Sequence, residues 1–235
     1  MKKKIVITGG SGRFAQSLKT YKNKHQLFYP TKQELNILKT KSIKIYLKKI
    51  KPNYLIHMAG MSRPMLSHDS QIVKSIDLNI IGTANITKIC SELNIKLIYF
   101  STNYVYPGSR GNYKEKDPVK PFNNYAWSKL GGECSVQMYK NSLILRICMT
   151  EFPFVHNNAL CDVYNSFIFH HEVASILFKI LNKKGILNIG GKRQTIYDFA
   201  KKSKPNIKKI YLKKIKNVKI PNDCSINIGK LKKYL

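Results

Sequence analysis

The sequence predicts an α/β fold built around a parallel, doubly wound sheet, and three observations support this prediction. The first unit runs from an apolar stretch, KIVIT at 4–8, through a glycine-rich turn, GGSGR at 9–13, into a helical pattern at 14–21. Strand-like and helix-like stretches then alternate along the chain. No internal repeat or low-complexity linker interrupts them. Strands alternating with helices are typical of parallel sheets that helices cover on both faces.

Each later element follows from its local pattern. Short apolar or β-branched runs indicate strands, and apolar residues spaced three and four apart indicate helices. The expected strands are HQLFYP at 25–30, NYLIHMAG at 53–60, IKLIYFST at 95–102, SLILRI at 142–147 and ILNIGG at 186–191. The expected helices cover 40–50, 69–93, 123–139 and 171–181. Because parallel strands end at a common edge, the glycine turn and the ends of the later strands should meet there.

The glycine turn indicates a phosphate-binding site. A strand, a glycine turn and a helix in this order direct backbone N–H groups and a helix N-terminus at a pyrophosphate. Gly9 and Gly12 permit a tight turn and close approach, and Ala15 takes the third small position of the pattern T-G-x-x-G-x-x-A. The pattern alone does not prove dinucleotide binding, because such turns occur in many α/β proteins.

The stretch YAWSK at 125–129 places Tyr125 and Lys129 on one face of a helix. Spacing alone is weak evidence, since 14 Tyr and 37 Lys give about 2 Tyr-x-x-x-Lys pairs by chance. The other pair, Tyr197 and Lys201, follows no strand-end hydroxyl and is interpreted as a solvated helix face. The first pair instead follows Thr102, which ends a strand at the expected ligand edge.

These three side chains have complementary chemistry. A free tyrosine has a pKa near 10, and a neighbouring lysine ammonium should lower that pKa by favouring the phenolate. The lysine can also hold the ribose hydroxyls of a dinucleotide, and Thr102 can orient a substrate carbonyl. With a nicotinamide in the same crevice, the set suits hydride transfer to a carbonyl, with Tyr125 supplying the proton.

The formal net charge of +30 on 235 residues raises nucleic-acid binding as an alternative. Residues 179–235 hold 17 basic and 2 acidic residues, and their net charge of +15 is half of the total. However, the basic residues are 37 Lys and only 5 Arg, whereas base recognition favours Arg. The excess of lysine over arginine fits a general bias in amino-acid composition better than a nucleic-acid-binding surface, so we expect no nucleic-acid partner. A positive field still favours small anionic ligands such as nucleotides.

The chain holds five scattered cysteines, Cys90, Cys134, Cys148, Cys161 and Cys224. Without a C-x-x-C pair they predict neither a disulfide framework nor a zinc site, and they favour a reducing cytoplasm. The neighbouring His170, His171 and Glu172 would point in different directions on a helix, so no metal site is expected. No apolar run approaches the ~18–20 residues of a membrane span, and the run at 5–8 is too short for a signal peptide.

Several of these stretches resemble the extended short-chain dehydrogenase/reductases, and among them the dTDP-4-dehydrorhamnose reductases most closely. The matching stretches are TGGSGRFA at 8–15, QELNI at 33–37, KPNYLIHMAG at 51–60, DLNIIGTANI at 77–86, FSTNYVYPGSRGNYKEKDPVKPFNNYAWSKLGGE at 100–133 and PNDCSINIGKLKKYL at 221–235. The stretch at 100–133 is the most specific, because it links strand end, loop and Tyr-x-x-x-Lys helix in order.

The resemblance implies a Rossmann-type domain and a role for each matching position. Tyr125 would donate the proton, Lys129 would hold the ribose, and Thr102 would orient the carbonyl. The cofactor would contact Gly9, Ser11, Gly12, Arg13, Phe14, Thr31, Lys32, Asn36, Ile37, Met58, Ala59, Gly60, Tyr125 and Lys129. Asn103 and Tyr104 are candidates for substrate contact, while Asn79 is expected to shape the neighbouring helix.

The end of the second strand favours NADP(H) over NAD(H). An NAD-preferring fold places an acid there to bind the ribose 2′-hydroxyl. Residues 29–32 read YPTK, with no acid before Glu34. Thr31 and Lys32, together with Arg13, could instead receive a 2′-phosphate.

The sequence departs from the family pattern in two places. Asn103 follows Thr102 where the rhamnose-pathway reductases have an aspartate, and Asn103-Tyr104 replaces the Asp-Glu pair of the 4,6-dehydratases. Since an amide supplies no titratable proton, dehydratase activity is disfavoured. In addition, only about 23 residues, 148–170, stand in place of a longer substrate-binding segment, which suits a smaller or more open site, or one that another subunit completes.

We therefore expect a dinucleotide-binding domain over 1–147. Residues 148–235 would supply a shortened substrate-binding segment, a returning strand and helix, and a basic C-terminal tail, all in one compact unit. The expected function is NADP(H)-dependent reduction of a 4-keto-6-deoxy sugar nucleotide. No membrane partner is expected, and the sequence is compatible with a homodimer. The alternatives are a sugar-nucleotide epimerase and a non-catalytic, dinucleotide-binding regulatory subunit.

Overall fold

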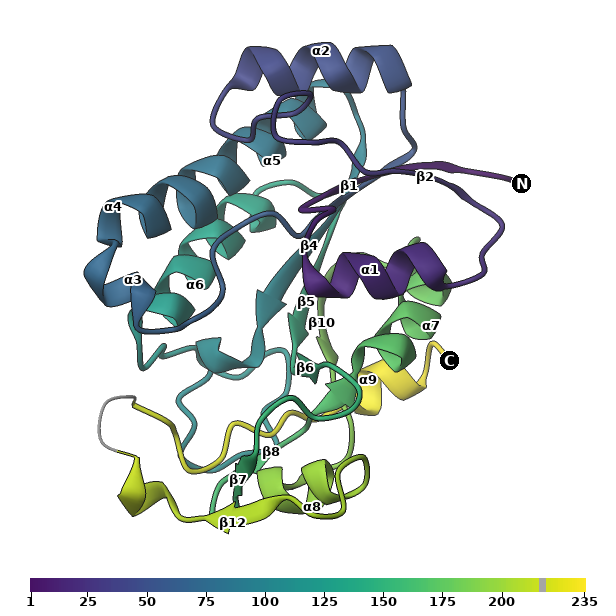
Figure 1. The fold of residues 1–235 in the computed structure, drawn as a ribbon. Helices are drawn as coiled ribbons and strands as arrows, with labels where there is room; N and C mark the ends of the chain where they lie inside the picture. The colour runs from purple at the N-terminus through teal and green to yellow at the C-terminus, as the bar shows by residue number, and fades with distance from the viewer. Residues whose placement is uncertain (216–218) are drawn as a thin grey trace.

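A six-stranded sheet forms the centre of the computed structural model, which describes residues 1–215 and 219–235 (Figure 1). Its strand order is β10-β5-β4-β3-β1-β2, and every neighbouring pair is parallel. The strands are β1 (Lys4–Thr8), β2 (Gln26–Phe28), β3 (Tyr54–His57), β4 (Lys96–Thr102), β5 (Ser142–Ile147) and β10 (Gly185–Ile189). The predicted α/β class with a parallel, doubly wound sheet is confirmed.

The strand order reverses at β1, which has β2 on one side and β3 on the other. At such a reversal the connections leave in opposite directions, and a crevice opens beyond the carboxyl ends of the strands. The glycine turn after β1 and the end of β3 therefore face this crevice from its two sides.

Two helical layers cover the sheet (Figure 1). The helices α1 (Arg13–Thr20), α7 (His170–Ile180) and α9 (Gly229–Lys232) lie on one face, and α2 (Thr40–Ile50), α5 (Gly82–Glu92) and α6 (Asn124–Gln137) lie on the other. Because side chains alternate along a strand, Ile5 and Ile7 join the core under α1 and α7, while Val6 joins the core under α2 and α5. All three are fully buried, each contributing roughly 1.5–3 kcal/mol.

The helix predicted over 69–93 is divided into α3 (Ser67–Ser70), α4 (Ile72–Ser75), the π-helix η1 (Ile76–Ile81) and α5. The chain leaves helical geometry at Gln71, with φ −124° and ψ 52°. The wider turns of a π-helix also rotate the residues before it relative to those after it. Consequently Ile72 and Val73 are 52% and 74% exposed, while Ile86 and Ile89 of α5 are buried.

The smaller part beneath the sheet combines residues that are distant in sequence (Figure 1). Its short strands pair β7 (Asn158–Leu160) with β12 (Lys208–Ile210), β8 (Tyr164–Asn165) with β11 (Gln194–Thr195), and β6 (Met149–Thr150) with β9 (Ile168–Phe169). Helix α8 (Ile196–Lys201) and two 3₁₀ turns, η2 (Asn103–Val105) and η3 (Leu212–Lys214), complete the assignments. Phe154, Phe169 and Phe199 share a separate core. Within 1–215 and 219–235, no helix has the length and apolarity needed to cross a membrane.

Candidate active site

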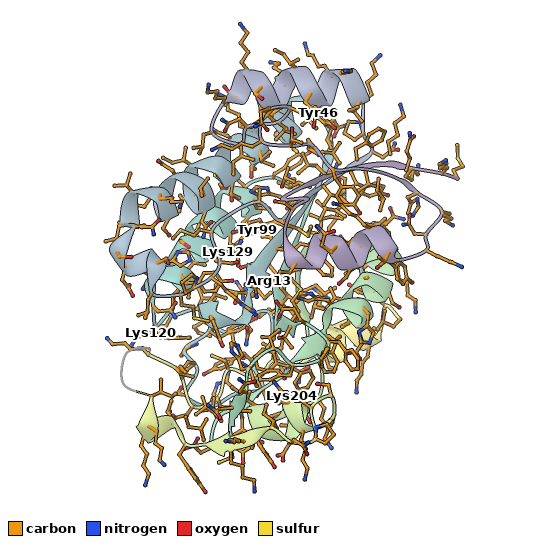
Figure 2. All side chains as sticks on the ribbon, viewed as in Figure 1. Arg13, Tyr46, Tyr99, Lys120, Lys129 and Lys204 are labelled. Carbon is orange, nitrogen blue, oxygen red and sulfur yellow. The ribbon has the colours of Figure 1, made fainter. Side chains whose placement is uncertain are left out.

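A cavity of about 340 Å³ opens at the carboxyl edge of the sheet. Many of the residues predicted from sequence line it together: Gly9, Gly12, Arg13, Phe14, Met58, Gly60, Thr102, Asn103, Tyr104, Tyr125 and Lys129. Figure 2 shows Arg13 and Lys129 near the centre of the molecule, between the helical layers and the smaller part. The glycine turn has the geometry that a pyrophosphate needs. Gly9 has a φ of +76°, and the Gly12 N–H donates to the Gly9 carbonyl at 2.9 Å before α1 begins.

Helix α6 presents Tyr125 and Lys129 to the cavity from its first two turns. The helix begins after Asn123, whose side-chain oxygen accepts a hydrogen bond from the Ala126 N–H at 2.8 Å. Farther along, a Cβ at Gly132 would lie 2.5 Å from the Asn79 carbonyl oxygen and 2.7 Å from the Tyr99 hydroxyl. Gly132 therefore allows α6 to approach η1 and β4 closely, which fixes the distance between the helix and the sheet.

Tyr125 is held as a protonated phenol. Burial raises its pKa, although a hydrogen bond with Thr102 and the charge of Arg63 act in the opposite direction. The expected lowering of the Tyr125 pKa is therefore wrong, because burial outweighs the nearby charges. A protonated phenol at neutral pH suits a group that donates a proton to a carbonyl oxygen.

The amino group of Lys129 is largely desolvated. Burial lowers its pKa to about 7, and the carboxylate of Glu133 opposes this shift. Its Nζ lies 4.3 Å from the centroid of the Tyr99 ring, whose hydroxyl donates to the Lys129 carbonyl at 3.0 Å (Figure 2). Glu133 in turn accepts hydrogen bonds from Arg146 and, at 2.7 Å, from Ser101. The lysine thus lies over a β4 side chain, and the nearby carboxylate of Glu133 is held by groups from β4 and β5.

A buried chain of polar groups that the sequence did not indicate supports the crevice. The ring nitrogens of His57 lie 2.8 Å from the Thr8 hydroxyl oxygen and 3.1 Å from that of Thr83. The Thr8 hydroxyl also accepts hydrogen bonds from the N–H groups of Met58 and Ala59, both at 3.2 Å. Burial lowers the pKa of His57 to about 3, so the imidazole is neutral and serves as a fixed hydrogen-bonding link between β1, β3 and α5.

Asn79 and Asn103 both hold chain segments in place. Asn79 bonds the N–H and the carbonyl of Met61 at 2.7 and 2.8 Å, and its amide also donates to Ser128. The Asn103 amide donates to Asn165 and to the Cys224 carbonyl, both at 2.8 Å. Although Asn103 lines the cavity, its donors are therefore engaged in joining the end of β4 to the smaller part.

Six of the predicted cofactor residues do not line this cavity: Ser11, Thr31, Lys32, Asn36, Ile37 and Ala59. The Thr31 N–H and hydroxyl donate to the Glu34 carboxylate at 2.8 and 3.0 Å. Lys32 lines a separate hollow beside α3 and α4. Asn36 accepts a hydrogen bond from the Leu38 N–H, and Ile37 is buried. Thr31 and Arg13 have different acidic partners, since Arg13 pairs with Glu151.

Five polar residues of the cavity wall were not among the site residues predicted from sequence: Ser62, Arg63, Ser101, Glu151 and His170. Glu151 lies 2.7 Å from Arg13 and 3.3 Å from Arg63. Burial alone would raise the pKa of Glu151, but the hydrogen bond from Arg13 and the charge of Arg63 hold it at about 2. Burial lowers the pKa of His170 to about 4. The scarcity of arginine was the available signal, because two of only five arginines meet here.

Comparison of the sequence with known proteins gives a family match and several relatives. The family model described as RmlD substrate binding domain matches residues 2–158. Methionine adenosyltransferase 2 subunit beta from Xenopus laevis is 28% identical over 155 residues, which are 62% of this chain and 46% of that protein. The chain thus spans less than half of that relative's length.

Two solved structures extend the likeness to nearly the whole chain. The dTDP-4-dehydrorhamnose reductase from Bacillus anthracis, solved with NADP, has a TM-score of 0.88 at 21% identity and covers 99% of this chain and 92% of its own. The Bordetella bronchiseptica enzyme WbmG, solved with NAD and UDP, has a TM-score of 0.72 at 17% identity and covers 99% and 88%. At these identities the likeness establishes a reductase-like fold.

Proposed function

Because the chain belongs to the RmlD substrate-binding domain family, we propose that it reduces the keto group of a 4-keto-6-deoxy sugar nucleotide with NADP(H). The observation that supports this most is the convergence of Thr102, Tyr125 and Lys129 on the cavity that the glycine turn also lines. The nicotinamide, when bound, supplies the hydride that adds to the carbonyl carbon.

The side chains of the chain perform the remaining steps. Thr102 hydrogen-bonds the carbonyl oxygen and holds it beside Tyr125. The Tyr125 hydroxyl transfers its proton to this oxygen as the hydride arrives, which gives an alcohol and a phenolate that solvent reprotonates. Lys129 holds the ribose, and its charge stabilises the phenolate as it forms. Gly9, Gly12 and the backbone N–H groups in the first turn of α1 bind the pyrophosphate.

NADP(H) is the proposed cofactor because Thr31 and Lys32 are exposed after β2 and can meet a 2′-phosphate. Glu34 already accepts both hydrogen bonds from Thr31, so the phosphate must displace that carboxylate or bind beside it. Titration of NADPH and NADH at equal ionic strength, followed by Trp127 emission, tests the preference. Equal affinity for NADPH and NADH would contradict the preference for NADP(H). Lys32→Gln should weaken the binding of NADPH and leave that of NADH unchanged.

The decisive test uses Tyr125→Phe with a 4-keto-6-deoxy sugar nucleotide and NADPH. Removal of the phenol should lower kcat by about 10²–10⁴-fold while the NADPH dissociation constant stays within about twofold. Net NADPH oxidation supports a reductase. Inversion of the sugar with no net oxidation would instead identify an epimerase.

A second candidate function is that of a dinucleotide-binding subunit of another enzyme. It is favoured by the likeness to methionine adenosyltransferase 2 subunit beta and by the amide at Asn103. In that case NADPH should bind without turnover across several keto-sugars, and Tyr125→Phe should change nothing that is measured.

A further inference from the structure

Every arginine of this lysine-rich chain pairs with an acid. The pairs are Arg13 and Arg63 with Glu151, Arg110 with Asp117, Arg146 with Glu133, and Arg193 with Asp223. Among the described residues, Lys44 is the one lysine in such a pair. Arginine is thus found where its planar fork of donors matters, and only Arg13 and Arg63 line the cavity.

Glu151 joins two arginines from opposite sides of the crevice. Arg13 is the first residue of α1, Arg63 lies in the loop after β3, and Glu151 follows β6. Oε1 of Glu151 lies 2.7 Å from Nη1 of Arg13 and 3.4 Å from Nη1 of Arg63, and Oε2 lies 3.3 Å from the same Arg63 atom. Within 1–215 and 219–235, neither guanidinium makes another hydrogen bond, so most of their N–H groups remain available.

The charges of this cluster favour an anion. Two guanidinium groups face one carboxylate, which leaves an excess positive charge at the mouth of the cavity. The Arg63 and Arg13 side chains are 38% and 61% exposed, so a ligand can reach them, whereas Glu151 is 17% exposed. The Arg63 charge also opposes the burial-raised pKa values of Tyr104 and Tyr125, which indicates that it lies near the proposed reacting group.

We propose that Arg63, together with Arg13, is a clamp for the diphosphate of the nucleotide-linked substrate, and that Glu151 occupies this clamp until the diphosphate replaces it. A carboxylate presents two oxygens to a guanidinium, as a phosphate does, so the exchange conserves the bonding pattern. The clamp rests on the proposed function, because it assumes a substrate that carries a diphosphate. It supplies phosphate contacts from outside the short segment 148–170, which contains neither lysine nor arginine.

The test is calorimetric titration of dTDP and of UDP into the protein saturated with NADPH. Saturation with NADPH fills the pyrophosphate site of the cofactor and isolates the substrate site. Arg63→Gln should weaken nucleoside diphosphate binding by about 10–100-fold, as expected for a lost charge-assisted contact. Glu151→Gln removes the competing carboxylate and should tighten binding several-fold. Variants that merely disturb the fold would weaken binding in both cases.

Arg110→Gln is the matched control, because it removes the same charge from a 62% exposed arginine away from the cavity and should leave both affinities unchanged. The NADPH dissociation constant should stay within about twofold in Arg63→Gln. Wild-type affinity in Arg63→Gln, weaker binding in Glu151→Gln, or no diphosphate binding by the wild type would each overturn the clamp. If the protein binds dTDP through Arg63 but oxidises no NADPH, the clamp is supported and the reductase activity is contradicted. If Arg63→Gln leaves turnover unchanged, the reductase activity is supported and the clamp is contradicted.

Discussion

Lys129 connects the proposed catalysis to stability, because folding places its amino group where water is largely excluded. Its pKa falls from the ordinary 10.5 to about 7. Between these values the unfolded chain binds the extra proton and the folded chain does not, so the stability contribution of Lys129 improves as pH rises from 7 to 10.5. Below pH 7 both states are protonated, and the penalty for the buried charge is greatest.

Lys129→Met should therefore stabilise the fold at low pH while it abolishes turnover. We expect its Tm to exceed that of the wild type by at least about 2 °C at pH 6, the effect of roughly 1 kcal/mol in a chain of this size. The difference should shrink towards pH 10, and thermal unfolding across this range measures it. Lys201→Met, on the exposed face of α8, is the control. An equal Tm difference at pH 6 and pH 10 would show that Lys129 is not desolvated.

The hydrogen-bond partners of Asn103 could not be predicted from its local sequence. The amide departs from the family pattern at the end of β4. Its partners, Asn165 and Cys224, lie 62 and 121 positions away, so no local pattern could indicate that both donors were engaged. The same holds for the Thr8–His57–Thr83 chain, whose members come from three elements.

At the scale of elements, the short strands and the glycine turn were readable because their signals are local. The strands at 4–8 and 142–147 coincide with β1 and β5, and the helix at 40–50 coincides with α2. The expected helix over 69–93 failed because the apolar spacing of Ile72, Val73 and Ile76 satisfies a helix without showing which face packs. The break at Gln71 and the π-turns depend on tertiary contacts, including the loop that Asn79 holds.

The position of α6 on the sheet depends on Gly132, and a matched pair of substitutions isolates this dependence. An alanine Cβ at Gly132 meets backbone and a buried tyrosine hydroxyl. The three atoms nearest to one at Gly131 all belong to the Ile80 side chain, the closest 2.8 Å away. Gly132→Ala should displace α6, cost about 1–3 kcal/mol of unfolding free energy and lower kcat, because Tyr125 and Lys129 move with the helix.

Gly131→Ala is the control, since the Ile80 side chain can adjust and alanine favours the helix by up to about 1 kcal/mol. Urea unfolding and steady-state kinetics of both variants provide the measurements. If Gly132→Ala retained the stability and kcat of Gly131→Ala, the close approach of α6 would not position the catalytic pair.

At the scale of the whole molecule, the site unites distant parts of the chain. The cavity takes its floor from segments after β5, while the return at 219–235 bridges Ile226 to Tyr113 and Asp223 to Tyr164. Residues from both sides of position 147 thus line one cavity, and the boundary predicted there stays a prediction.

The net charge of +30 should make the fold more stable in salt. The chain has 42 Lys and Arg against 12 Asp and Glu, and in the described part of the chain a single lysine has an acidic partner. Screening at 0.1 M reduces interactions beyond about 10 Å, so it weakens the many long-range repulsions more than the few close pairs. We expect Tm to rise by about 2–5 °C between roughly 20 and 300 mM NaCl, as measured by circular dichroism.

KCl should reproduce this rise in Tm, and sucrose at matched osmolality should not, which separates charge screening from solvent exclusion. A Tm that falls with salt would mean that the six ion pairs among the described residues, Arg146–Glu133 foremost, outweigh the repulsion among the lysines.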